Sequence, residues 1–105
     1  MPAPPQVTHF RRLLRKARTD HPLCFRPEQR LNRPHSEIIA QFQSFRKHYR
    51  EFLCPNLQFL IEAKTVDSMW IGRLRKDLNS TLKVLECQLA SYTQVRLAFQ
   101  EPLFG

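Results

Sequence analysis

The chain has 105 residues, of which 42% are hydrophobic and only two are glycine, and its formal net charge is +8. This composition excludes wholesale disorder and argues against a turn-rich β fold, and the length suits one domain with a modest core. Residues 1–50 hold 11 Arg and Lys against 3 Asp and Glu, whereas residues 51–105 hold 6 of each. Such asymmetry is typical of a face that binds phosphates, anionic lipid or an acidic protein, although a solvated face would also produce it.

The N-terminal third predicts a tail, one helix and a proline-rich connection. Residues 1–6 hold three prolines and read as an extended tail. Apolar residues then recur at spacings of three and four, which predicts an amphipathic helix over about 7–19 with Thr8 as its N-cap. Its stripe consists of Val7, Phe10, Leu14 and Ala17, with Leu13 alongside. Residues 20–35 contain Pro22, Pro27 and Pro34, so we expect an ordered loop there, attached to the core through Leu23 and Phe25.

The middle of the chain predicts an aromatic-rich helix. Pro34 suits its first turn, and its apolar stripe consists of Ile38, Phe42, Phe45, Tyr49 and Phe52. We expect Pro55 to end this helix and Asn56 to start the next one.

The remainder reads as helix from Leu57 to about Phe99, with a weak point at residues 65–68, where Asp67 or Ser68 could cap a new helix. Beyond it, apolar residues at heptad-like spacing predict a helix that packs across a bundle or on a partner, namely Ile71, Leu74, Leu78, Leu85, Tyr92, Val95 and Phe99.

Enzyme chemistry and metal binding find little support in the sequence. No H-E-x-x-H, glycine-rich phosphate loop, G-x-S-x-G or C-x-x-C is present. His9 and His48 read as surface residues, and Cys24, Cys54 and Cys87 as reduced, partly buried thiols. No apolar run approaches the ~18 residues of a membrane span, and the N-terminus has a matrix-targeting character because Asp20 is its first acid.

The segment from His9 to Arg18, H-F-R-R-L-L-R-K-A-R, resembles the first helix of the mitochondrial LYR family, in which a Leu-Tyr-Arg triplet precedes x-Leu-Leu-Arg-x-Ala-Arg. Residues 45–48, F-R-K-H, are similar to the Phe-Arg-Lys-Asn segment of that family's second helix. Here His9 replaces the leucine and Phe10 the tyrosine, and the proline-rich loop is longer than the family pattern.

This resemblance implies an all-α, antiparallel three-helix bundle over residues 7–75, with 76–105 as a C-terminal helical extension that docks on a host complex. Family members bind the mitochondrial acyl carrier protein, whose phosphopantetheine arm delivers its acyl chain into the bundle. The implied carrier contacts are Phe10, Arg11, Arg15, Arg46, Lys47 and Arg50. The implied lining of the acyl chain is Leu14, Phe42, Phe45 and Tyr49, although ordinary core packing would use the same stripe.

We therefore expect a non-enzymatic accessory subunit or assembly factor of a mitochondrial complex, of the respiratory chain or ATP synthase. It would lie in the matrix or at the matrix face of the inner membrane, and would bind no cofactor directly beyond the acyl-phosphopantetheine of its partner. The alternative is a basic mitochondrial ribosomal protein that contacts rRNA, although its aromatic residues fall on the apolar stripes rather than among the cations. A third reading is a membrane-surface protein that uses the first helix.

Overall fold

The computed structural model describes residues 2–98, and its side chains are described as far as Thr93. The protein is all-α, since the described chain is mostly helical and contains no strand. In chain order the elements are α1 (Pro5–Asp20), α2 (Pro22–Phe25), the short 3-10 helix η1 (Pro27–Arg30), α3 (His35–His48), the π-helical turn η2 (Tyr49–Leu53), α4 (Cys54–Ala63) and α5 (Ser68–Ala98).

The first helix begins earlier than predicted. It starts at Pro5, directly after Pro4, and Thr8 lies inside its first turn, so the prediction of Thr8 as N-cap and of an extended segment to residue 6 was wrong. Proline suits this position because its fixed φ matches the helix and its missing N–H would have had no partner there. The predicted stripe is confirmed, because the buried residues of α1 are Val7, Phe10, Leu14 and Ala17.

The proline-rich connection is more ordered than a loop, because it forms α2 and η1. Leu23 is buried and Phe25 packs against the core, as predicted. Arg30 adds a contact that the sequence did not predict. Its guanidinium donates to the carbonyl oxygens of Leu23 (2.7 Å) and Cys24 (3.3 Å) and to Gln88 Oε1 on α5 (2.9 Å).

The second long helix does not end at Pro55. The chain stays helical from 35 to 63, and Pro55 lies in the first turn of α4. Proline lacks the N–H that would bond the carbonyl four residues earlier, and its ring would collide with that carbonyl. The wider π turn at Tyr49–Leu53 precedes it, with the Cys54 N–H donating to the Tyr49 carbonyl. Asn56 does not start a helix. Instead, its side-chain amide donates to the Phe52 carbonyl at 2.8 Å.

The π turn changes which residues enter the core. Ile38, Phe42 and Phe45 are buried as predicted and Tyr49 is half-buried, but Phe52 is 38% exposed and Leu53 is fully buried. A π turn contains one residue more than an α turn, so the apolar face moves forward by one position.

The predicted break before the last helix is confirmed. Lys64 adopts the left-handed conformation with φ of 56°, and Asp67 accepts the Met69 N–H at 2.9 Å. Helix α5 then runs without interruption past residue 75. Ile71, Leu74, Leu78 and Leu85 are buried as predicted and Tyr92 is partly buried, while the Val95 side chain and Phe99 lie outside the described part.

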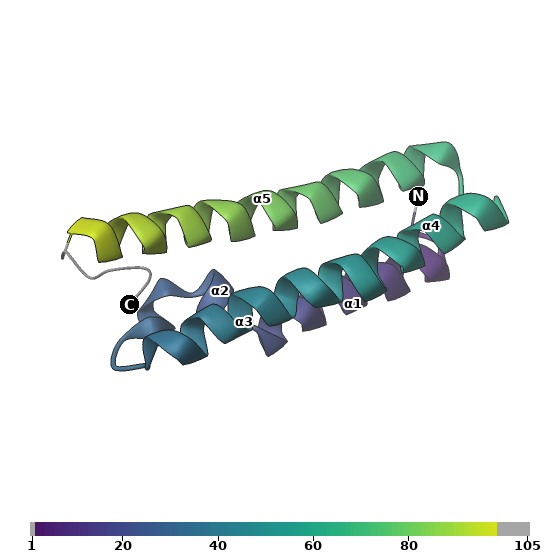
Figure 1. Ribbon diagram of the computed structural model, residues 1–105. Helices are drawn as coiled ribbons and strands as arrows, with labels where there is room; N and C mark the ends of the chain where they lie inside the picture. The colour runs from purple at the N-terminus through teal and green to yellow at the C-terminus, as the bar shows by residue number, and fades with distance from the viewer. Residues whose placement is uncertain (1, 99–105) are drawn as a thin grey trace.

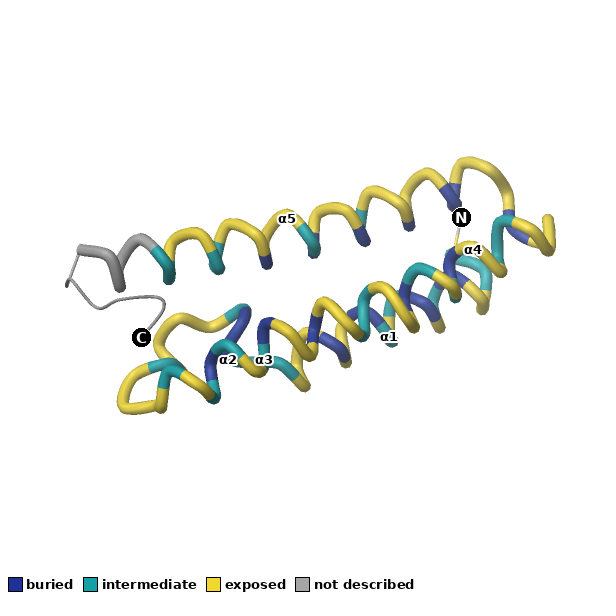
Figure 2. The backbone as a smooth tube through the Cα atoms, viewed as in Figure 1, coloured by how far each residue is buried: buried dark blue, intermediate teal, exposed yellow. Residues whose placement is uncertain are grey.

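Three long helical rods lie side by side, namely α1, the continuous α3–α4 helix and α5 (Figure 1). Helix α5 contacts α1, α2 and α4, and its length makes the molecule elongated, at 51 × 21 × 17 Å. The buried residues lie on the sides of the rods that face one another (Figure 2). No helix in the described part of the chain is long and apolar enough to cross a membrane.

Candidate functional site

A basic concave feature lies between α1 and α5. It encloses about 520 Å³, and four of its eleven lining residues are arginines. We call it the arginine groove, and its lining residues are Arg11, Leu14, Arg15, Arg18, Thr19, Phe25, Arg26, Asp77, Ser80, Thr81 and Val84.

Arg11 is held in place at one edge of the groove. Its Nε donates to Asp77 Oδ2 at 3.1 Å, and its guanidinium lies 5.5 Å from the centre of the Trp70 ring. Both partners belong to α5, so this predicted carrier contact also joins the first and last helices. Because the pair is partly exposed, we expect it to contribute only ~0.2–1 kcal/mol to stability.

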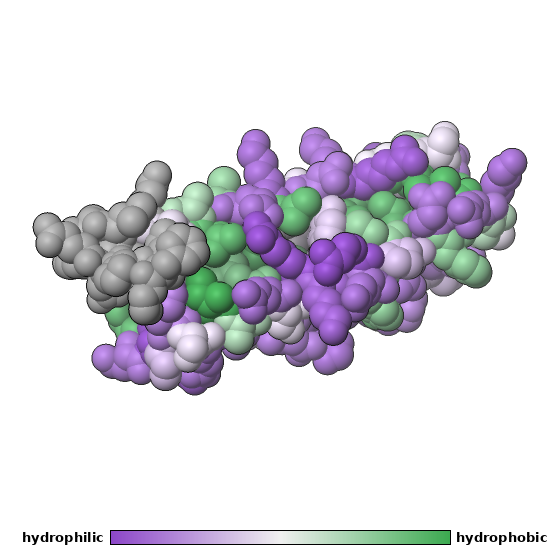
Figure 3. All heavy atoms as spheres, viewed as in Figure 1, coloured by the Kyte–Doolittle hydropathy of each residue, from purple (hydrophilic) through white to green (hydrophobic). Residues whose placement is uncertain are grey.

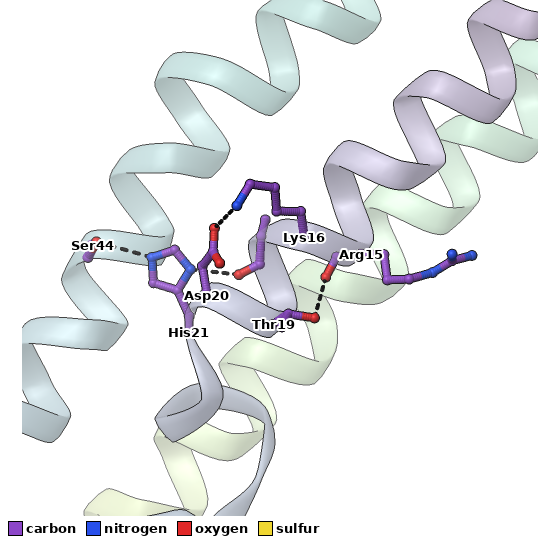
Figure 4. A network of polar contacts seen from close by, with 7 residues as sticks. Arg15, Lys16, Thr19, Asp20, His21 and Ser44 are labelled. Atoms are coloured by element: carbon purple, nitrogen blue, oxygen red, sulfur yellow. Dashed lines mark hydrogen bonds and ion pairs between the residues drawn. The ribbon is translucent and has the colours of Figure 1, made fainter.

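The other three arginines of the groove carry uncompensated charge. Arg18 lies over the Phe25 ring at 5.1 Å. Within residues 2–98, no carboxylate forms an ion pair with Arg15, Arg18 or Arg26. Figure 4 shows the Arg15 side chain leading away from the side of α1 where His21 reaches Ser44 of α3. The groove therefore has one acid for four guanidinium groups.

The predicted cations of α3 and η2 do not join this groove. Arg46 is already neutralised, because its guanidinium donates to both carboxylate oxygens of Glu86 at 3.0 and 2.9 Å. Lys47 and Arg50 are exposed. Asp77 and Glu86 lie nine residues apart on α5, which places them on opposite sides of that helix at ~100° per residue. The structure thus separates Arg11 and Arg15 from Arg46, Lys47 and Arg50.

The predicted acyl-lining residues fill the core. Phe42 and Phe45 are 2% and 0% exposed, Leu14 is buried, and Tyr49 is half-buried, with burial raising the pKa of its hydroxyl. Phe45 packs edge-on against Phe25 and His21, with ring centres 5.1 and 5.4 Å away. An acyl chain at these residues would have to displace core contacts, so their lining role stays a prediction.

A second hollow lies between the start of α1 and α4. It encloses about 450 Å³. Its lining includes Phe59, which is 70% exposed, and Phe10, the predicted carrier contact, which is buried in the free chain. The other lining residues are Pro5, Gln6, His9, Leu13, Asn56 and Leu60. This hollow is mainly apolar, and sequence reasoning did not select Leu13, Phe59 or Leu60 for a site.

The thiols and histidines form no recognisable reactive centre. The described residues contain no group of three His, Cys, Asp or Glu side chains placed to hold a metal ion. All three cysteines are free, but Cys24 is buried, Cys54 is partly buried and Cys87 is exposed, so the prediction of partial burial fails for the first and last. Burial and the neighbouring His21 lower the pKa of His48.

Sequence reasoning missed Arg18 and Arg26 as site residues. Arg18 could have been found, because positions 11, 15 and 18 share one face of an α-helix. Arg26 could not, since it follows α2 and reaches the groove only through the fold of the proline-rich connection.

The surface is otherwise mixed in polarity. On the face seen in Figure 3, hydrophilic side chains gather along the middle of the molecule, with hydrophobic patches on either side. The chain matches no protein-family profile, no curated protein and no solved structure. The likeness of residues 7–75 to the LYR family therefore stays a prediction from the residues quoted above.

Proposed function

We propose that this chain is a non-enzymatic accessory subunit or assembly factor of the LYR type, which binds the acylated mitochondrial acyl carrier protein in the matrix. The observation that carries the proposal is the arginine groove, where Arg15, Arg18 and Arg26 have no acidic partner in the described chain. An acidic protein surface supplies the missing carboxylates.

The groove would orient the carrier, and Arg11 and Arg15 would make the contacts that the family likeness implies. Exposed ion pairs contribute only ~0.2–1 kcal/mol each, so they guide association more than they hold the complex together. Lys47 of α3 and Arg50 of η2, which lie apart from the groove, would contact a second part of the carrier or of the host complex.

The acyl chain would provide most of the affinity. Burying a chain of about a dozen carbons gains on the order of 9 kcal/mol before entropic costs, at ~0.8 kcal/mol per methylene. Because Leu14, Phe42 and Phe45 are packed in the free chain, this energy would also have to offset the opening of the core. Because Leu78 and Leu85 are buried within the protein, only the exposed face of the helix beyond residue 75 would then meet the host complex.

Co-expression with the mitochondrial acyl carrier protein of the same organism, followed by native mass spectrometry, tests this proposal. We expect a one-to-one complex whose mass includes an acyl-phosphopantetheine group. A chain that ignores the carrier but purifies with RNA in a salt-sensitive manner would contradict the proposal and favour the ribosomal alternative.

A further inference from the structure

Three arginines of the arginine groove, Arg11, Arg15 and Arg18, form a row along one face of α1. Around α1, Arg15 and Arg18 lie about 40° and 20° to either side of Arg11, because each residue advances by ~100°. Along the axis the three are separated by ~6 Å and ~4.5 Å, at ~1.5 Å per residue. Arg26 reaches the same groove from the segment after α2. The row therefore spans ~10.5 Å along the helix axis, so its long side chains must converge to contact phosphates in series.

This row differs from three other surface cations, which have acids beside them, and from Arg75 and Lys83, which form no ion pair in the described chain but lie outside the groove. Lys16 pairs with Asp20, Arg33 with Glu37 and Arg46 with Glu86. In the groove, Asp77 alone faces four arginines. Like charges four residues apart on a helix destabilise it by ~0.2–0.5 kcal/mol, so an anion bound here would relieve a repulsion that the free protein retains.

The donor chemistry favours phosphate. A guanidinium presents two parallel N–H groups that match two phosphate oxygens, whereas a lysine offers only a point charge, and all four cations here are arginines. Ser80 adds a hydroxyl group, whereas that of Thr19 already donates to the Arg15 carbonyl at 3.1 Å, and Leu14, Phe25 and Val84 provide an apolar surface beside them. The enclosed volume of about 520 Å³ falls within the range of ~300–1,000 Å³ that is usual for small-molecule sites.

We propose that the arginine groove is a binding site for a small ligand that carries two or three phosphates in series, of the nucleoside polyphosphate class. Arg15 and Arg18 hold neighbouring phosphates, Arg26 closes the row, and Arg11 adds its terminal nitrogens, since Asp77 engages only its Nε. The apolar surface of Leu14, Phe25 and Val84 accepts the uncharged part of the ligand. This site goes beyond carrier binding and needs no carrier, although both ligands would compete for Arg11 and Arg15.

The test is isothermal titration calorimetry of the full chain at about 0.15 M salt, with sodium tripolyphosphate as the probe. We expect saturable one-to-one binding that weakens at least about tenfold in the double variant Arg18→Gln, Arg26→Gln. The matched control Arg75→Gln, Lys83→Gln removes the same charge from exposed α5 positions outside the groove and should change the affinity less than about twofold.

Three results would overturn the proposal. These are the absence of saturable binding, an equal loss in both double variants, and binding of a single-stranded RNA decamer through the groove without binding of tripolyphosphate. Equal melting temperatures of the two variants would show that any difference is local. Because the carrier is absent from this experiment, failure here leaves the proposed carrier binding untouched, and failure of carrier binding leaves this site untouched.

Discussion

At the scale of single residues, Arg30 shows how this small helical protein holds a proline-rich connection in place. Its guanidinium bonds two carbonyl oxygens of α2 and the amide of Gln88, and it lies over the rings of Phe42 and Tyr92 at 5.5 and 5.7 Å. Burial lowers the pKa of this group from its ordinary value, but it stays charged at neutral pH. No local sequence pattern predicts these contacts, because the two partners on α5, Gln88 and Tyr92, lie 58 and 62 positions along the chain from Arg30.

We therefore expect Arg30→Ala to reduce the free energy of unfolding by about 2–3 kcal/mol, because it leaves the Leu23 and Cys24 carbonyls without a donor. Arg30→Lys should recover less than half of this loss, since an ammonium cannot bond three groups in the same fork geometry. Urea unfolding of the variants measures both. Full recovery by lysine would show that charge alone matters at this position.

Cys24 is the second residue whose environment has a measurable consequence. Burial raises the pKa of its thiol from 9.0 to about 12, against the smaller effect of Arg30. In the unfolded chain the thiol ionises from about pH 9, whereas in the folded chain it keeps its proton. The folded state then binds more protons, so stability must fall as pH rises above 9, by up to ~1.4 kcal/mol per pH unit.

We expect Cys24→Ala to flatten the decrease in unfolding free energy between pH 9 and 10.5, measured by urea unfolding at a series of pH values. Cys87→Ala is the matched control, because that thiol is exposed, and it should keep the wild-type slope. Identical slopes for all three proteins would contradict the assignment of the pH dependence to Cys24.

At the scale of elements, apolar periodicity predicted where helices lie better than how they join. The stripes of α1 and α3, and that of α5 as far as Tyr92, were correct because burial of one face determines them. The predicted helix end at Pro55 was wrong. Proline usually ends a helix, but here the π turn before it accommodates the missing N–H and the ring. The rule that proline ends a helix considers only the local backbone. The packing of the continuous helix against α5 outweighs that local preference.

The π turn predicts that Leu53 matters more for stability than Phe52, whereas an uninterrupted α-helical stripe would predict the opposite order. Leu53→Ala should cost about 2–5 kcal/mol of unfolding free energy, because Leu53 is fully buried. Phe52→Ala should cost under about 1 kcal/mol, because Phe52 is partly exposed. Chemical denaturation of both variants measures which one loses more unfolding free energy. A larger loss for Phe52→Ala would contradict the shift of the apolar face by the π turn.

At the scale of the whole molecule, the fold distributes the charge that the sequence concentrates in its first half. Asp77 and Glu86 of α5 neutralise Arg11 and Arg46 on opposite sides of that helix, and Arg15, Arg18 and Arg26 remain without acids in the described chain. The sequence indicated a basic helix face with Arg11 and Arg15. It could not indicate which cations would stay unpaired, because that depends on the rotation of α5 about its axis.

The affinity of acylated mitochondrial acyl carrier protein for the full chain, measured by calorimetry at about 0.15 M salt, tests the central claim most directly. We compare the wild type with Arg15→Glu, Arg18→Glu in the groove and with Arg75→Glu, Lys83→Glu outside it. The proposed carrier binding predicts at least about a tenfold loss for the groove variant and less than about twofold for the other. Equal affinities in all three proteins, or no carrier binding by the wild type, would contradict it.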